Sequence, residues 1–120
     1  MILVDSSVWI DHLRRESAPV SLLLSSRQVL AHPFVIGEVA VGNLRNRRQI
    51  LHTLRDLPAA VVASDEEVLE FIERYLLAGR GLGYIDVHLL AAARLSRAGL
   101  WTYDKRLQAS AELLSLAANP

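Results

Sequence analysis

The chain opens with Met1-Ile2-Leu3-Val4-Asp5, a short apolar run that ends in a carboxylate. The run is rich in leucine and β-branched residues and no turn residue precedes it, so it predicts a buried strand. A helix is expected to follow from Ser7 to about Arg15, with Val8 and Trp9 among its apolar residues. Because ligands of parallel α/β sheets bind beyond the carboxyl ends of the strands, Asp5 stands where such a fold places its active edge.

Strands and helices alternate along the rest of the chain. Four strands are expected at 1–5, 28–31, 59–63 and 100–103, with a possible last strand at 113–116. Helices are expected at 7–15, 19–25, 33–41, 43–56, from the capping box Ser64–Glu67 to about 76, at 84–98 and after 104. This alternation predicts one domain over residues 1–120, a three-layer α/β/α sandwich around a central, mostly parallel twisted sheet.

Composition narrows the class of protein. Hydrophobic residues make up 52% of the 120 residues, enough for a core, and the absence of cysteine excludes disulfides and cysteine-bound zinc. No signal peptide or membrane span is expected, which favours a soluble, cytoplasmic protein. Thirteen basic residues balance thirteen acidic ones, which counts mildly against a nucleic-acid binder. The local run Arg45-Asn46-Arg47-Arg48 is either a phosphate-contacting patch or a solvated helix face.

Four acids interrupt or end apolar segments. Asp5 and Asp104 each end an expected strand, whereas Glu38 and Asp86 fall within apolar helical stretches. A carboxylate in a core-facing stretch costs several kcal/mol unless it is paired or binds a metal. Taken singly, Asp5 and Asp104 are more simply explained as helix N-caps, and Asp86 as a first-turn residue that the helix dipole stabilises. Glu38 has no comparable explanation.

The four acids together predict one cation site. Clustered carboxylates repel one another and some protonate unless a cation neutralises them. A set of oxygen ligands favours Mg²⁺ or Mn²⁺. Such a site suits phosphodiester hydrolysis, with a carboxylate orienting or deprotonating the attacking water.

At these positions the chain resembles the PIN-domain nucleases, and within them the VapC toxins of bacterial toxin–antitoxin pairs. Four segments in the family's order carry the resemblance over nearly the whole chain. They are Met1-Ile2-Leu3-Val4-Asp5-Ser6-Ser7-Val8-Trp9-Ile10-Asp11, Ile36-Gly37-Glu38-Val39-Ala40-Val41-Gly42, Ile85-Asp86-Val87-His88-Leu89-Leu90-Ala91-Ala92-Ala93 and Leu100-Trp101-Thr102-Tyr103-Asp104-Lys105-Arg106-Leu107.

The resemblance implies a ribonuclease that depends on Mg²⁺ or Mn²⁺, forms homodimers and is inhibited by a cognate VapB-type antitoxin. It places Asp5, Asp86 and Asp104 on metal-binding positions and Glu38 on a position that acts through water. It also implies that Ser7 and Thr102 are hydroxyl residues that support the first and fourth acids.

Some members carry a further acid after the fourth, where this chain has Lys105 and Arg106, which counts against a second metal. The Lys105 or Arg106 side chain could instead contact a phosphate of the substrate. Arg80, in the glycine-rich loop 79–83, is a second candidate for RNA contact. We expect structural or surface roles for His12, His32, His52 and His88, whose spacing does not fit a zinc site.

Two other functions fit parts of the pattern. One is a non-catalytic, RNA-interacting PIN-like module, against which the presence of all four acids counts. The other is a phosphotransfer protein. An aspartate-nucleophile phosphatase would want a second Asp at position 7, which is Ser7, and a receiver domain would want an Asp where the expected strand 59–63 ends at Ser64.

Overall fold

Three short parallel strands form the centre of the computed structural model, which describes all 120 residues. They are β1 (Ile2–Val4), β2 (Val29–Leu30) and β3 (Gly99–Trp101), in the order β2-β1-β3. Ile2 lies opposite Val29 on one side and Gly99 on the other. β1 is therefore the middle strand, and its carboxyl end lies beside that of β3.

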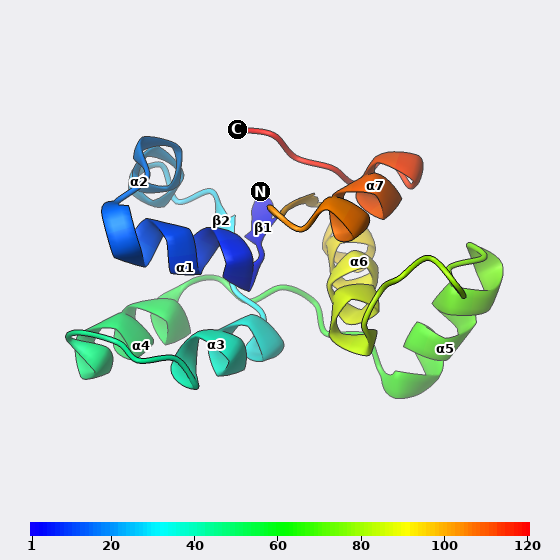
Figure 1. Cartoon of the computed structure of the whole chain (residues 1–120), viewed down its shortest axis with the longest axis horizontal. Coiled ribbons are helices and arrows are strands. Elements are labelled where there is room, and N and C mark those ends of the chain that lie inside the picture. Colours follow the sequence, from blue (N-terminus) through cyan, green and yellow to red (C-terminus); the bar gives the residue numbers. More distant parts are fainter.

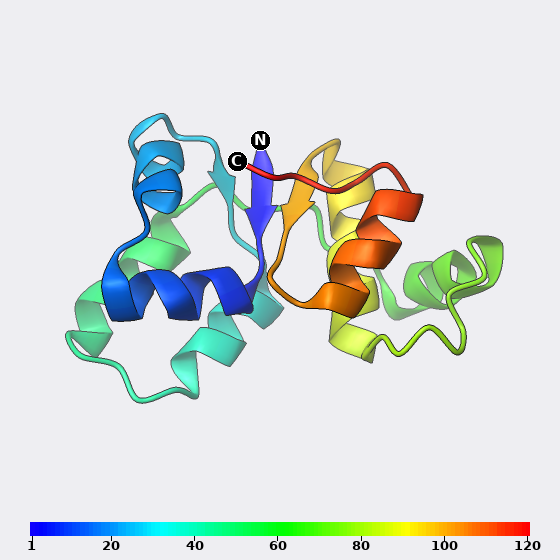
Figure 2. The ribbon, with the colours of Figure 1, turned by 45° about the horizontal axis from the view of Figure 1, so that its top comes forward.

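Seven helices flank this sheet. They are α1 (Ser6–Arg15), α2 (Ala18–Ser25), α3 (Pro33–Ala40), α4 (Arg47–Asp56), α5 (Asp65–Arg74), α6 (Tyr84–Ser96) and α7 (Lys105–Leu113). Figures 1 and 2 show α1 to α4 on the β2 side and α5 to α7 on the β3 side. The segments that follow β1 and β3 meet between these groups. The expected α/β fold with a parallel sheet is confirmed.

The strands are shorter and fewer than the sequence predicts. Of the expected strand 59–63 only Ala59 pairs, through an isolated parallel bridge to Ala31. The next residues leave the ladder: the Val61 N–H donates to the Ser96 hydroxyl oxygen at 2.8 Å, and Val61 is half exposed. The expected last strand at 113–116 was also misplaced, because Leu113 ends α7 and the bridge to Leu100 is made by Ala117.

Several helix boundaries also differ from the prediction, and two of them lie next to left-handed residues. The helix expected from Asn43 begins at Arg47, because Asn46 has a φ of 53° and the left-handed conformation ends any helical run there. The helix expected to reach Ala98 ends at Ser96, since Arg97 is left-handed with a φ of 52°. A positive φ at a residue other than glycine has no dependable signal in the sequence.

The core lies on both faces of the sheet. Leu3, Val4 and Leu100 are completely buried, as expected for a parallel sheet covered by helices. Trp9 and Trp101 are also buried and belong to this core. No helix combines the length and apolar character that crossing a bilayer requires.

Candidate active site

Asp5 is buried at the carboxyl end of β1, where two hydroxyl groups hold it. Its side chain is 6% exposed, and its Oδ2 accepts hydrogen bonds from Ser7 Oγ and Thr102 Oγ1, both at 2.7 Å. Asp5 occupies the N-cap position of α1 but makes no side-chain cap bond. The simple interpretation of Asp5 as a helix cap is therefore wrong. Ser7 bonds to the first acid, as its expected role requires, and Thr102, expected to support the fourth acid, donates its hydroxyl to the first.

Asp104 is tied to the same hydroxyl group from the end of the neighbouring strand. Its backbone N–H donates to Thr102 Oγ1 at 3.0 Å, and its Oδ1 accepts the Leu107 N–H at 3.0 Å. Asp104 therefore does cap α7 with one carboxylate oxygen. Thr102 bonds to both Asp5 and Asp104, so the carboxyl ends of β1 and β3 form one unit.

Glu38 and Asp86 reach the site from two helices. Glu38 lies in α3, and its Oε1 accepts a hydrogen bond from Ser6 Oγ of α1 at 3.1 Å. Asp86 lies in the first turn of α6, and its Oδ2 accepts the Gly83 N–H at 2.9 Å. Both side chains are only partly buried, so each carboxylate still has access to solvent.

Electrostatic coupling shows that the four acids share one region. Burial raises the pKa of Glu38 above its usual value, and the charges of Asp5 and Asp86 raise it further, whereas the Ser6 hydrogen bond opposes them. Burial likewise raises the pKa of Asp86, with further contributions from Asp104 and Asp5 against the Gly83 bond. Like charges that lie close together favour protonation, which is the behaviour expected of a carboxylate cluster lacking a cation.

Each of the four carboxylates has one oxygen engaged by the protein and one without a protein donor. The engaged oxygens are Asp5 Oδ2, Glu38 Oε1, Asp86 Oδ2 and Asp104 Oδ1. The remaining oxygens form a donor set suited to a hard cation. The grouping is loose, because no three Asp, Glu or His side chains are gathered tightly enough to enclose an ion.

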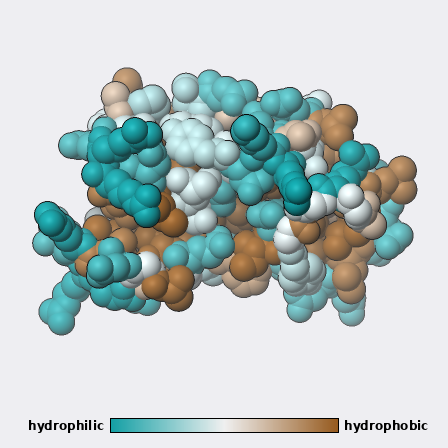
Figure 3. Space-filling view, in the orientation of Figure 1, coloured by the Kyte–Doolittle hydropathy of each residue, from teal (hydrophilic) through white to brown (hydrophobic).

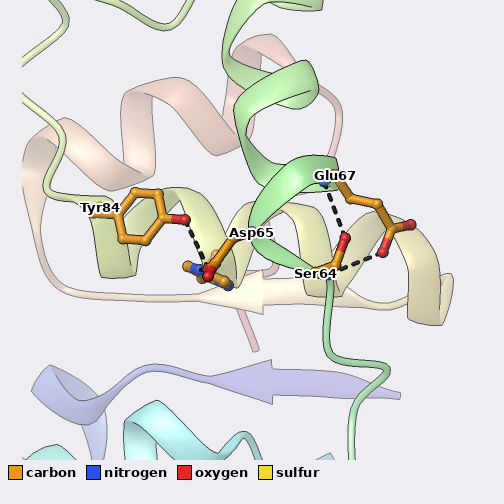
Figure 4. A network of polar contacts seen from close by, with 5 residues as sticks. Ser64, Asp65, Glu67 and Tyr84 are labelled. Atoms are coloured by element: carbon orange, nitrogen blue, oxygen red, sulfur yellow. Dashed lines mark hydrogen bonds and ion pairs between the residues drawn. The ribbon is translucent and has the colours of Figure 1, made fainter.

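A polar network docks α5 onto the start of α6, close to Asp86 (Figure 4). The expected capping box is present: Ser64 Oγ accepts the Glu67 N–H at 3.1 Å, and Glu67 Oε1 accepts the Ser64 N–H at 2.9 Å. This cap sets the position of Asp65, whose Oδ1 accepts the Tyr84 hydroxyl at 2.9 Å. The same oxygen lies 3.4 Å from Nε2 of the buried His88. The first turn of α6, which carries Asp86, is thereby tied to a second helix.

The expected site residues therefore converge, but the sequence did not identify all of their partners. Ser6 was one of two hydroxyl residues after Asp5, and the pattern did not show that it faces Glu38 while Ser7 faces Asp5. Asp65 and Tyr84 had no local signal, since α5 and α6 are brought together only by the tertiary fold.

The candidate active site does not coincide with the prominent hollow of the surface. A hollow of about 880 Å³ lies between α5 and α6 and is lined in part by Leu69, Phe71 and Tyr75. Figure 3 shows apolar side chains gathered over α5, among the hydrophilic side chains that cover much of this face. The candidate active site rests on its chemistry, and none of the four acids lines this hollow.

Comparison with known proteins settles the family. A model of the PIN domain matches residues 2–113. This chain belongs to the PIN-domain family. The match extends from β1 to the end of α7 and so includes all four acids.

The chain is also similar to curated relatives and to a solved structure. The chain is 45% identical over 111 residues to Ribonuclease VapC32 of Mycobacterium tuberculosis, in strains CDC 1551 and H37Rv, covering 92% of this chain and 90% of the relative. The resemblance to VapC proteins is thereby confirmed. The crystal structure of PAE2754 from Pyrobaculum aerophilum superposes with a TM-score of 0.62 at 20% identity, over 94% of this chain and 85% of that one. This second likeness supports the fold.

Proposed function

We propose that this PIN-domain protein is an endoribonuclease dependent on Mg²⁺ or Mn²⁺, and the toxin of a VapBC-type pair. The observation that carries the proposal is the convergence of Asp5, Glu38, Asp86 and Asp104 at one sheet edge, with burial and mutual repulsion raising the pKa values of Glu38 and Asp86. The 45% identity to Ribonuclease VapC32 supports RNA as the substrate.

In this proposal Asp5, Asp86 and Asp104 hold the metal. The donor set fits a hard cation, since every candidate ligand is a carboxylate with an oxygen that makes no hydrogen bond to the protein. When bound, the cation supplies Lewis-acid stabilisation of charge on the phosphoryl oxygens and lowers the pKa of water. Ser7 and Thr102 act as positioning residues, because their hydroxyl groups fix the orientation of the Asp5 carboxylate.

Glu38 has the role of orienting and deprotonating the attacking water. Its raised pKa suits a general base, which works best when its pKa approaches the working pH. Ser6 holds one oxygen of the carboxylate and leaves the other to accept a proton. The partial burial of Glu38 allows water to reach this oxygen.

The remaining features of the proposal follow from the kinship with VapC proteins. We propose a VapB-type antitoxin as the protein partner, a homodimer as the working assembly and the cytoplasm as the place of action. Residues 1–120 form a single PIN domain in this proposal, which the match over residues 2–113 supports. No membrane is involved.

The direct test is Asp5→Asn. This variant keeps the hydrogen-bonding shape of the side chain but loses the charge, so we expect RNA cleavage with Mn²⁺ and growth arrest on expression both to disappear. Circular dichroism and thermal unfolding check that the fold persists. The hypothesis fails if Asp5→Asn cleaves RNA as fast as the parent protein.

A second candidate function is a catalytically inactive PIN-like protein that only binds RNA. The loose grouping of the acids is the observation that favours it. Isothermal titration calorimetry separates the two functions, because the inactive module would release no heat of binding with Mn²⁺ or Mg²⁺, whereas the nuclease would bind with a stoichiometry that Asp5→Asn abolishes.

A further inference from the structure

Two cations stand next to the carboxylate site without acidic partners. Lys105 and Arg106 directly follow Asp104, in the first turn of α7, and both are exposed. The ion pairs of the structure are Arg15–Asp11 and His88–Asp65, so neither cation is paired. The dipole of α7 disfavours positive charge in this turn. Their position therefore does not serve the stability of the helix.

The Arg106 side chain lies against Gly81, in the loop that leads into α6. A Cβ atom at Gly81 would lie 2.7 Å from Arg106 Cδ and 2.8 Å from Nη1, and Gly81 has a φ of +75°. The positive φ favours glycine at this position, and a Cβ atom there would displace the Arg106 side chain. The Arg106 side chain thus lies against the loop whose last residue, Gly83, donates its N–H to Asp86 Oδ2.

The guanidinium of Arg106 makes no hydrogen bond in the protein, although the end of the side chain lies against Gly81. Arg80, adjacent to Gly81, uses Nε to donate to the Leu76 carbonyl at 2.9 Å, which leaves its terminal nitrogens unengaged. Arg80 lies in the 79–83 loop, and Lys105 and Arg106 lie at the start of α7. The two segments touch through Gly81 and Arg106. The loop also binds Asp86 through the Gly83 N–H, and α7 begins directly after Asp104.

We propose that Arg106, flanked by Lys105 and Arg80, binds a backbone phosphate of the RNA beside the scissile bond. The proposal rests on RNA being the substrate. The planar guanidinium donates two parallel hydrogen bonds to phosphate oxygens, and packing against Gly81 reduces the entropy lost on binding. Contacts of this kind position a nucleic acid and carry no sequence information, so Arg106 sets where the strand lies relative to the acids.

The test measures RNA binding separately from cleavage. In an Asp5→Asn background a fluorescently labelled single-stranded RNA stays intact, and anisotropy gives its Kd at several salt concentrations. Arg106→Gln should raise the Kd about three- to tenfold and lower the salt slope by about 0.7, the value for one phosphate on a single strand. Arg106→Lys should recover part of the affinity, since it keeps the charge but loses the fork.

Arg97→Gln is the matched control. Arg97 is exposed, makes no side-chain hydrogen bond and lies just before β3, at the sheet edge opposite the acids. The proposal is overturned if Arg106→Gln changes the Kd and the salt slope no more than Arg97→Gln, or if the Asp5→Asn protein binds no RNA. Failure of the proposed nuclease function shows itself differently, as absence of cleavage by the parent protein with Mn²⁺.

Discussion

Thr102 links the two strand-end acids through a single hydroxyl group. Thr102 Oγ1 donates to Asp5 Oδ2 and accepts the backbone N–H of Asp104, and the residue is only 5% exposed. A buried hydroxyl with both functions filled fixes two carboxylates at once. For the geometry of the site, the hydroxyl oxygen of Thr102 therefore matters more than the volume of its side chain.

We therefore expect Thr102→Val to damage the site although valine has nearly the same shape. The Asp5 carboxylate loses one of two donors, so Mn²⁺ affinity should fall about 10- to 100-fold, with RNA cleavage following it. The free energy of unfolding should fall by about 1–3 kcal/mol, because the Asp104 N–H loses its acceptor. Calorimetry and urea unfolding measure both effects. Thr102→Ser is the control, and equal behaviour of the Val and Ser variants would contradict the role of the hydroxyl.

At the scale of elements, α3 begins with an unusual cap. His32 is fully buried and its Nδ1 accepts the Phe34 N–H at 3.0 Å. Because Nδ1 accepts, the neutral ring carries its proton on Nε2. Desolvation by burial lowers the pKa of His32 from 6.5 to about 4, with a further contribution from the neighbouring His88. Since α3 carries Glu38, this cap also bears on the active site.

This cap predicts how stability changes with pH. The unfolded chain protonates His32 near pH 6.5 but the folded chain only near pH 4, so stability is lost as the pH falls through that window. Between about pH 7 and about pH 5 the loss should be about 2 kcal/mol. Asparagine also caps helices but does not titrate in this range. His32→Asn should therefore reduce the pH dependence of unfolding by about that amount in urea titrations. An unchanged dependence would contradict the assignment.

Periodicity and cap residues were enough to predict most helices, because an amphipathic repeat and a residue such as Ser64 or Pro33 are local signals. The predicted strands were less accurate. Ala59 and Ala117 pair by single bridges, and whether residues beside them join the ladder depends on tertiary partners such as Ser96. Left-handed Asn46 delays the start of a predicted helix from Asn43 to Arg47 for a similar reason, because local helix propensity does not predict a turn that the tertiary fold imposes.

At the scale of the whole molecule, the site is assembled from segments far apart in the sequence. Parallel strands all end at one edge of the sheet, so the sequence was sufficient to place Asp5 and Asp104 at the same edge, and the structure makes their strands neighbours. The position of Glu38 was not predictable in the same way, since it depends on how α3 packs against α1, where Ser6 meets it. The four-acid set was therefore predictable as a list, and its geometry was not.

Assembly of the acids from separate elements predicts that a bound cation stabilises the whole fold. Burial and like charge raise the pKa values of Glu38 and Asp86, so the metal-free protein loses stability as the pH rises through these values and both groups ionise. Mn²⁺ offsets that cost, and at about a hundredfold excess over Kd it should add about 2.7 kcal/mol at neutral pH. The gain should shrink as the pH is lowered, because protons compete with the metal for the carboxylates. Thermal unfolding with and without Mn²⁺ measures it, and an equal shift in Asp5→Asn would show that the ion binds elsewhere.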